Sequence, residues 1–341
     1  MPEQHPSVAD KRRQFHELHR SGCFVIPNPW DPGSARYLQT LGFKALATTS
    51  SGFAWSRGLP DYGITLEAVL AHLAAMADAT DLPINADFQN GFAHDARGVE
   101  QNVRLAVDTG VAGLSIEDST GDEARPLYDL ELAAQRIRAA RRAIDAKGGD
   151  TLLVGRAECF LLGRTDIEET LARLRAYADA GADCLYAPGV RLSEHIRRIV
   201  EGVAPKPVNL LVGSPNPMTV AEIAALGVRR ISVGGALARA AWSGFMRAAC
   251  QLAGEGKFDG LGGRPSRRPT LITVRGPGDA ATIRSTHGSY PRPFSTMSEA
   301  VARLRATAGL ASNSCGSVFG SVSMALTLTR GPATCAMTSA Y

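Results

Sequence analysis

The sequence predicts a (β/α)8 TIM barrel, an α/β fold in which eight parallel strands alternate with helices. Eight short apolar segments are spaced along residues 23–235, and stretches of helical periodicity separate them. Parallel strands need helical crossovers and are buried on both faces, so this alternation indicates a closed parallel barrel. Polar side chains at the ends of several segments support the same prediction, because such barrels carry their chemistry at the carboxyl ends of the strands.

Each element follows from its local pattern. The predicted strands are 23–31, 45–51, 83–88, 112–118, 152–158, 184–190, 207–213 and 229–235. Helical periodicity is found at 66–79, 99–109, 130–146, 169–180 and 220–226. The polar strand ends are Asp31, Ser51, Asp87, Glu117, Arg156 and Glu158. Acids, a base and a hydroxyl gathered at one end of a barrel are typical of an enzyme.

The chain divides into three parts. Residues 1–22 form an N-terminal helix whose main apolar positions are Phe15 and Leu18, and residues 23–255 form the catalytic barrel. Residues 256–341 are a tail rich in Gly, Pro and Ser, which we expect to be a largely irregular, poorly ordered extension. Only 297–308 has helical periodicity there. The alternative is a partner-binding tail.

Composition excludes several classes of function. The net charge of +4 comes from residues 270–341, which hold six arginines and two acids, so the barrel is neutral and nucleic acid is not an expected partner. No apolar run approaches the roughly 20 residues of a membrane span. The six cysteines show no C-x-x-C spacing, which predicts reduced thiols in a cytoplasmic protein. None of the five lysines is placed to point into the barrel mouth, which excludes Schiff-base chemistry.

Two acids end neighbouring strands. Asp87 closes the third strand and Glu117 closes the fourth. Carboxylates on adjacent strand ends can share one hard cation, which takes oxygen ligands and keeps several waters, so we predict Mg²⁺. The alternative is that both acids cap the helices that follow.

A buried cation and a polar turn complete the predicted mouth. Arg156 and Glu158 have the same side-chain parity, so both can face the barrel interior, where the guanidinium suits a substrate carboxylate. The alternative is a structural ion pair of Arg156 with Glu158 or Glu117. The turn after the second strand, 49–52, offers hydroxyl and N–H groups for an anionic oxygen, although ordinary turn chemistry gives the same residues.

Six ordered motifs resemble the phosphoenolpyruvate mutase/isocitrate lyase superfamily. They read NPWDPGSARYL, TSSGFAWSRGLPD, ADFQNGF, GVAGLSIED, GRAE and PVNLLVG, and the resemblance covers roughly residues 10–255. It implies a barrel whose C-terminal helix is swapped between subunits, in a homotetramer built as a dimer of dimers. It also implies Mg²⁺ and a small 2-oxo or 2-hydroxy carboxylate substrate, with chemistry that passes through an enolate.

The resemblance carries roles to individual positions. It implies that Asp87 binds Mg²⁺ directly and that Glu117 holds metal-bound water. It implies that Asp61 is an acid near the metal site and that Arg156 binds the substrate, so the expected catalytic residues are Arg156, Asp61 and Glu117. The remaining substrate-binding positions are Trp30, Ser51, Gly52 and Asn209.

Three departures from the family pattern stand out, and one of them is that the loop after the fourth strand lacks the Lys and Asn-Ser of the phosphonate-forming mutases. Gln89 occupies the place of a second metal-site aspartate, so we keep it as a metal-site residue of reduced affinity. The loop 118–130 reads DSTGDEARPLYDL and lacks the Lys-x-Cys-Gly-His of the isocitrate- and methylisocitrate-cleaving members. In its place, Arg125 or Tyr128 is a candidate lid over the substrate.

These observations favour a Mg²⁺-dependent carbon–carbon lyase, with oxaloacetate decarboxylation as a simple version. The alternative within the fold is a mutase or hydrolase of the P–C bond that acts on phosphonopyruvate or phosphoenolpyruvate. A third hypothesis is a non-catalytic barrel that binds a carboxylate.

Overall fold

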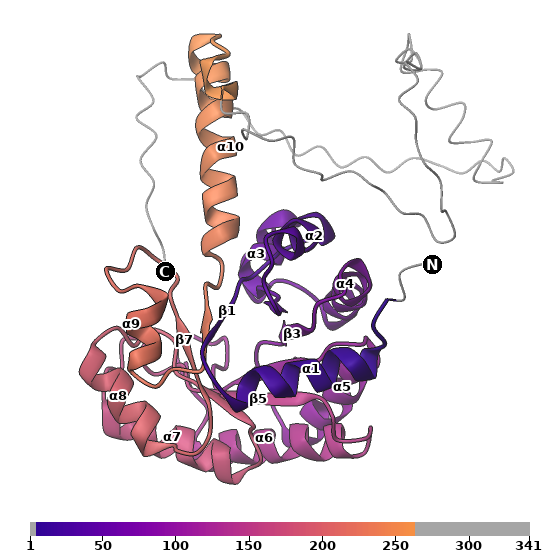
Figure 1. The fold of residues 1–341 in the computed structure, drawn as a ribbon, viewed down its shortest axis with the longest axis vertical. Coiled ribbons are helices and arrows are strands. Elements are labelled where there is room, and N and C mark those ends of the chain that lie inside the picture. The colour runs from indigo at the N-terminus through magenta and orange to yellow at the C-terminus, as the bar shows by residue number, and fades with distance from the viewer. Residues whose placement is uncertain (1–4, 263–341) are drawn as a thin grey trace, which may run out of the picture. The chain divides into compact units, whose positions relative to one another are not determined.

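The computed structural model describes residues 5–262, in which all eight predicted strands form one parallel sheet wrapped into a barrel (Figure 1). The strand order is β1-β8-β7-β6-β5-β4-β3-β2. The strands are β1 Phe24–Ile26, β2 Leu46–Ala47, β3 Ile84–Asp87, β4 Gly113–Glu117, β5 Leu152–Arg156, β6 Cys184–Tyr186, β7 Val208–Leu211 and β8 Arg230–Ser232. They are shorter than the apolar segments, because the ladders end where the strand tips turn into loops.

The helices follow the strands in alternation, as predicted. They are α1 Val8–Arg20, α2 Pro32–Thr40, α3 Ser50–Ser56, α4 Leu66–Ala79, α5 Ala96–Asp108, α6 Leu130–Asp145, α7 Ile167–Asp179, α8 Ser193–Gly202, α9 Val220–Ala225 and α10 Ala236–Glu255, with the short 3-10 turn η1 Asp259–Leu261. The five helical patterns in the sequence correspond to α4, α5, α6, α7 and α9, within three residues at each end. The (β/α)8 prediction is confirmed.

Asn28 closes the barrel at its mouth. β1 and β2 do not pair as neighbouring strands in the sheet. One backbone hydrogen bond links them, in which Ala47 N–H donates to Pro27 O at 3.0 Å. The Asn28 Nδ2 donates to Thr48 O at 2.8 Å, while its Oδ1 accepts from the N–H groups of Val233 and Gly234, both at 2.9 Å. One side chain therefore ties the ends of β1, β2 and β8 together.

Helix α1 covers the opposite end of the barrel. Phe15 is fully buried and packs with the apolar residues of the barrel interior. Its ring approaches Gly113 so closely that a Cβ there would lie 2.7 Å from the ring. Lys11 donates to the carbonyls of Ala77 and Thr80, which satisfies carbonyl groups at the C-terminal end of α4 and ties α1 to the barrel.

A buried histidine in this lower layer makes stability depend on pH. His19 Nδ1 bonds to Phe15 O at 2.7 Å, and its Nε2 lies 3.4 Å from Arg230 Nη1. Burial, and next the Arg230 charge, lower the His19 pKa to about 3. Below pH 6.5 His19 is protonated in the unfolded chain but stays neutral in the folded chain. The free energy of unfolding therefore falls as the pH drops from 6.5 toward 3.

We expect this histidine to cost about 2 to 3 kcal/mol of unfolding free energy at pH 4.5 relative to pH 7.5. Urea unfolding of the wild type and of His19→Gln at both pH values measures it. The difference between the two proteins isolates His19 from other titrating groups. Parallel pH dependence of the two proteins would contradict this assignment.

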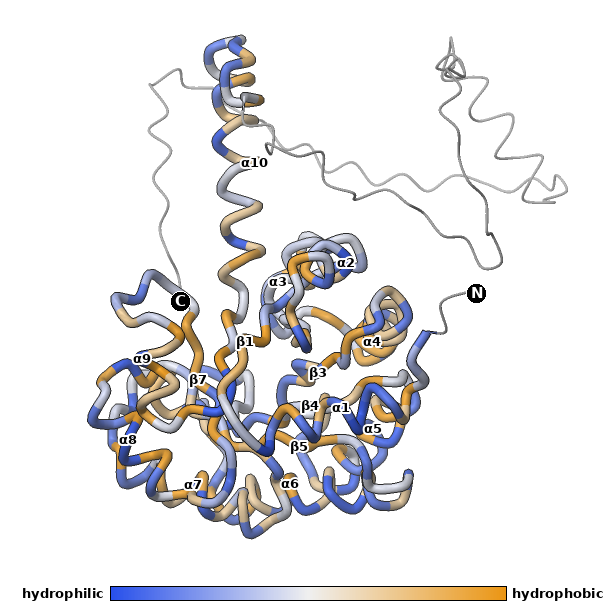
Figure 2. The backbone as a smooth tube through the Cα atoms, viewed as in Figure 1, coloured by the Kyte–Doolittle hydropathy of each residue, from blue (hydrophilic) through white to orange (hydrophobic). Residues whose placement is uncertain are grey.

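Helix α10 stands away from the barrel (Figure 1). Ala238, in its first turn, is the one residue that it buries. Figure 2 shows apolar residues along its length, and Trp242, Phe245, Met246 and Leu252 are all at least one-third exposed. An apolar helix surface of this size, left uncovered in one chain, is typical of an interface.

The N-terminal helix and the cysteines lie at least partly within the described residues, whereas most of the tail does not. The N-terminal helix is α1, and the predicted tail, including the helix at 297–308, lies almost entirely outside the described residues. Cys23, Cys159, Cys184 and Cys250 are free thiols. Among the helices of residues 5–262, none combines the length and apolarity that crossing a membrane requires.

Candidate active site

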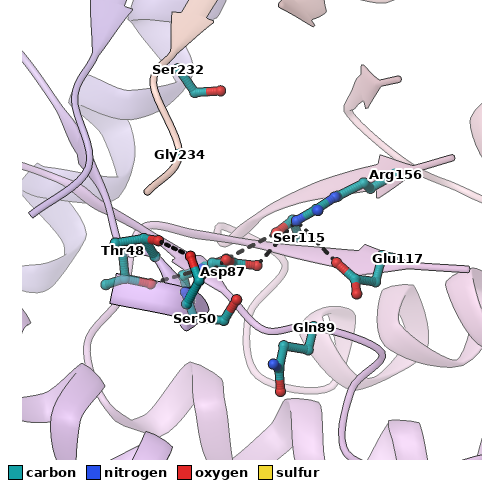
Figure 3. Close-up of polar contacts among 12 residues, drawn as sticks. Thr48, Ser50, Asp87, Gln89, Ser115, Glu117, Arg156, Ser232 and Gly234 are labelled. Carbon is teal, nitrogen blue, oxygen red and sulfur yellow. Dashed lines mark hydrogen bonds and ion pairs between the residues drawn. The ribbon is translucent and has the colours of Figure 1, made fainter. Parts of the chain in front are cut away.

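Asp87 occupies the centre of a polar cluster at the carboxyl ends of the strands (Figure 3). Its backbone N–H donates to the Thr48 hydroxyl at 2.8 Å, which joins β3 to β2. Its Oδ2 accepts from the Ser50 N–H at 2.9 Å, and its Oδ1 lies 3.3 Å from Arg156 Nη1. The side chain is 17 % exposed. Asp87 is therefore held by the protein while one edge faces the mouth.

Arg156 is the one cation of this cluster and pairs with three carboxylates. The register of β4 and β5 sets Glu117 opposite Arg156, and their Oε2 and Nη1 atoms are 3.0 Å apart. The Glu158 carboxylate takes the other edge of the guanidinium through Nε and Nη2. Both structural ion pairs considered from the sequence are present, and Arg156 contacts Asp87 as well (Figure 3).

The cluster carries more negative than positive charge. Burial, and also the nearby Glu158 and Asp87, raise the pKa of Glu117 despite its pairing with Arg156. Burial likewise raises the pKa of Glu158. The pKa of Arg156 is raised, because its carboxylate partners outweigh the cost of burying its charge. This arrangement of charges favours an additional cation that can share the carboxylates.

Asp61 and Gln89 form the outer side of the cluster. The Gln89 side chain donates from Nε2 to Asp61 Oδ1 at 3.0 Å, and the Gln89 backbone carbonyl accepts from Glu117 N–H at 3.0 Å. Partial burial, and next the charge of Asp87, raise the pKa of Asp61. An aspartate at position 89 would add another negative charge there, whereas the glutamine amide supplies a donor. Gln89 thus stabilises the ionised Asp61.

The turn after β2 lies on the other side of Asp87. Thr49 caps α3, and its hydroxyl lies 3.2 Å from the Ser51 hydroxyl and accepts from the Gly52 N–H at 3.3 Å. A Cβ at Gly52 would lie 2.7 Å from Thr49 Cγ2 and 3.1 Å from Trp30 Cβ, so only glycine fits. Trp30, Ser51 and Gly52 therefore lie side by side, and the Gly52 N–H already has the Thr49 hydroxyl as its acceptor.

Two further candidate positions make contacts outside the Asp87 cluster. Asn209 is buried in the barrel interior, where it donates to Ser232 at 2.9 Å and accepts from Arg230 at 2.9 Å. Within residues 5–262 its side-chain hydrogen bonds go to Ser232 and Arg230, and not to Arg156 or Asp87. Tyr128 is buried beneath Arg136, whose guanidinium lies 4.0 Å from the ring centroid, so it is not placed to move as a lid.

The loop between β4 and α6 folds into a hairpin. Ser119 and Leu127 form an antiparallel bridge, and Thr120 N–H donates to Pro126 O at 3.0 Å. Arg125 N–H donates to Asp122 O at 3.2 Å inside the same hairpin. The loop that carries no family signature therefore has a regular structure of its own.

Two contributors to the site were not identified from the sequence. Tyr62, next to Asp61, donates its hydroxyl to Glu117 Oε1. Asp118, which follows Glu117 directly, is a buried anchor that accepts from Glu158 N–H at 2.8 Å, from Tyr177 at 2.5 Å and from Arg173 at 3.1 Å. Nothing in the local pattern distinguishes Tyr62, whereas the I-E-D run could have drawn attention to Asp118.

The donor set fits a hard divalent cation. Asp87, Glu117 and Glu158 contact the single guanidinium of Arg156, which leaves two negative charges in excess that a charge of +2 would offset. Within residues 5–262 no three Asp, Glu, His or Cys side chains converge tightly enough to chelate an ion by themselves. A cation here would take one or two carboxylates and several waters, which is the usual arrangement for Mg²⁺.

Comparison with known proteins adds the family. The family model described as phosphoenolpyruvate phosphomutase matches residues 15–253. The chain belongs to this family. It is 31% identical over 236 residues to the oxaloacetate decarboxylase of Chromohalobacter salexigens, covering 66% of this chain and 79% of that protein.

Solved structures agree with this placement. A candidate lyase/mutase from Burkholderia cenocepacia J2315 shares 44% identity with a TM-score of 0.72, covering 76% of this chain and 94% of that one. The 2,3-dimethylmalate lyase, a member of the PEP mutase/isocitrate lyase superfamily, shares 27% identity with a TM-score of 0.66, covering 74% and 90%. The resemblance stated from the motifs is thus confirmed at the level of the superfamily.

Proposed function

We propose that this family member is a Mg²⁺-dependent lyase that cleaves a carbon–carbon bond in a small 2-oxo or 2-hydroxy carboxylate. The observation that carries the proposal is the Asp87–Glu117–Arg156 cluster at the barrel mouth, where acids outnumber the single base. Similarity to an oxaloacetate decarboxylase and to a dimethylmalate lyase supports this substrate class.

Oxaloacetate illustrates the reaction. The C3–C4 bond breaks, CO₂ leaves, and the bonding electrons form the enolate of pyruvate, which takes a proton at C3. Arg156 would pair with a substrate carboxylate through its fork of donors. Ser51 and Gly52, beside Asp87, would orient that carboxylate, and Trp30 would exclude water from one side. A substrate carboxylate would have to compete with Asp87, Glu117 and Glu158 for Arg156. A bound cation would ease this competition, because it would attract some of these acids away from the guanidinium.

Asp87 would hold Mg²⁺ directly, while Glu117, Asp61 and Gln89 would hold its waters. When bound, the ion would act as a Lewis acid and offset the negative charge that develops on the substrate. The chain's own contribution is the placement of these oxygens. The Thr48 and Ser50 contacts fix Asp87 before any ligand arrives.

The family match also supports P–C bond chemistry, as a mutase or hydrolase. A panel of oxaloacetate, methylisocitrate, dimethylmalate and phosphonopyruvate, each assayed with Mg²⁺, separates the two reactions. We expect turnover of an oxo- or hydroxy-dicarboxylate. Turnover of phosphonopyruvate alone would replace the lyase proposal with the P–C alternative. Turnover of none, together with no Mg²⁺-dependent thermal shift, would favour the non-catalytic barrel.

The exposed α10 supports an assembly of several copies. An oligomer that exchanges this helix would bury Trp242, Phe245 and Met246, in line with the swapped helix and dimer of dimers that the family resemblance implies. The free cysteines in the described part of the chain support a cytoplasmic location.

Phe245→Glu tests the role of α10. Phe245 is 62% exposed in the single chain, so a charge there costs the lone barrel little but would be buried at a subunit interface. We expect light scattering to show a smaller species for Phe245→Glu and an unchanged one for Phe245→Leu. An unaltered mass for the glutamate variant would contradict an interface through this face of α10.

A further inference from the structure

Tyr62 holds an unusual backbone conformation beside the site. Its φ is +64°, in the left-handed region that a bulky side chain rarely enters. Within the described residues, the other non-glycine residues of positive φ are Gln89 and Phe92, on the loop after β3. Such strain persists only where surrounding contacts hold it, and those contacts identify what the residue does.

The first contact is with Glu117. The Tyr62 hydroxyl donates to Glu117 Oε1, while Glu117 Oε2 lies 3.0 Å from Arg156 Nη1. Glu117 is 5% exposed, so its carboxylate depends on protein partners such as these two groups rather than on solvent. Tyr62 occupies one carboxylate oxygen and thereby opposes a two-oxygen pairing of Glu117 with the guanidinium.

The second contact is with the hairpin between β4 and α6. Gly121, at the hairpin tip, has a φ of +78°, and a Cβ there would lie 3.3 Å from Tyr62 Cδ1. The aromatic ring therefore packs against the tip, and the hydroxyl at its far end reaches the carboxylate. One side chain connects the hairpin to the Glu117 carboxylate.

We propose that Tyr62 is a positioning residue that sets the orientation of Glu117 for the bound cation and its waters. The inference rests on the proposed metal-dependent function and adds a residue to it. Arg156 already binds Glu158 through Nε and Nη2, and it attracts Glu117 as well. Without the tyrosine hydroxyl, Glu117 would turn toward Arg156 and away from the position in which it serves the cation.

Tyr62→Phe tests the proposal, with Tyr37→Phe as the matched control. Tyr37 lies on α2 and is 43% exposed, and its side chain makes no hydrogen bond to any residue of 5–262. Mn²⁺ binding to each protein, measured by electron paramagnetic resonance without substrate, is the first readout. The kcat and KM for oxaloacetate with Mg²⁺ are the second, and thermal unfolding checks the fold.

For Tyr62→Phe we expect about tenfold weaker Mn²⁺ binding and a lower kcat with little change in KM, as is typical when the outer partner of a metal site is lost. The control should match the wild type. Equal Mn²⁺ affinity and kcat in Tyr62→Phe and wild type would overturn this inference alone. Failure of the wild type to bind Mn²⁺ would overturn the metal-dependent function together with it.

Discussion

Replacing Asp87 by asparagine is expected to lower turnover by at least about 100-fold. Loss of an outer partner of a metal site costs up to about 100-fold, and Asp87 is the proposed direct ligand. The amide keeps the shape of the side chain and can still accept from the Ser50 N–H. It removes the charge that would bind the cation, and it removes one anionic partner of Arg156. Steady-state kinetics across a range of Mg²⁺ concentrations measures the effect.

The matched control for this variant is Asp122→Asn. Asp122 is exposed, and it lies in the hairpin between β4 and α6, outside the acidic cluster. The control should retain wild-type turnover. An Asp87→Asn protein that is folded and as active as the wild type would remove Asp87 from the mechanism.

Replacing Arg156 by methionine should abolish detectable turnover and also destabilise the protein. The Arg156 side chain is 15% exposed and pairs with Asp87, Glu117 and Glu158. Removal of one partner from a buried ion pair costs about 3 kcal/mol or more, because the remaining charge lacks compensation. Urea unfolding and an activity assay check the two effects separately.

The loss of stability in Arg156→Met should depend on pH. Burial raises the pKa values of Glu117 and Glu158, and removing the cation raises them further. The unfolded chain releases these protons near pH 4.5 and the folded chain only at higher pH, so destabilisation grows as the pH rises. We expect a larger deficit at pH 8 than at pH 5. Arg156→Lys, which retains the charge, should recover much of the stability but not the turnover.

The barrel and the centre of the site could be predicted because both depend on strand periodicity. Buried parallel strands read as apolar runs, and the polar residue that ends each run necessarily lies at the mouth. That logic places Asp87 and Glu117 on adjacent strands, and β3 and β4 do pair. The parity of Arg156 and Glu158 also predicts their contact, which the structure contains.

Features that depend on loops could not be predicted in this way. Tyr62 reaches Glu117 only because the backbone turns into the left-handed region, for which a tyrosine gives no signal. The hairpin tip at Gly121 and the burial of Tyr128 depend on contacts with distant segments. Asn209 has the parity of an inward residue, but its depth in the barrel depends on its pairing with Arg230, which strand periodicity does not determine.

The most direct test of the account is metal-dependent decarboxylation of oxaloacetate by the full chain. Pyruvate release would be followed with Mg²⁺, after chelation with EDTA, and after Mg²⁺ is restored, with Asp87→Asn protein in matched solutions as the background. The account predicts turnover above that background that EDTA abolishes and Mg²⁺ restores. Turnover that persists unchanged in EDTA would contradict the metal-dependent mechanism centred on Asp87.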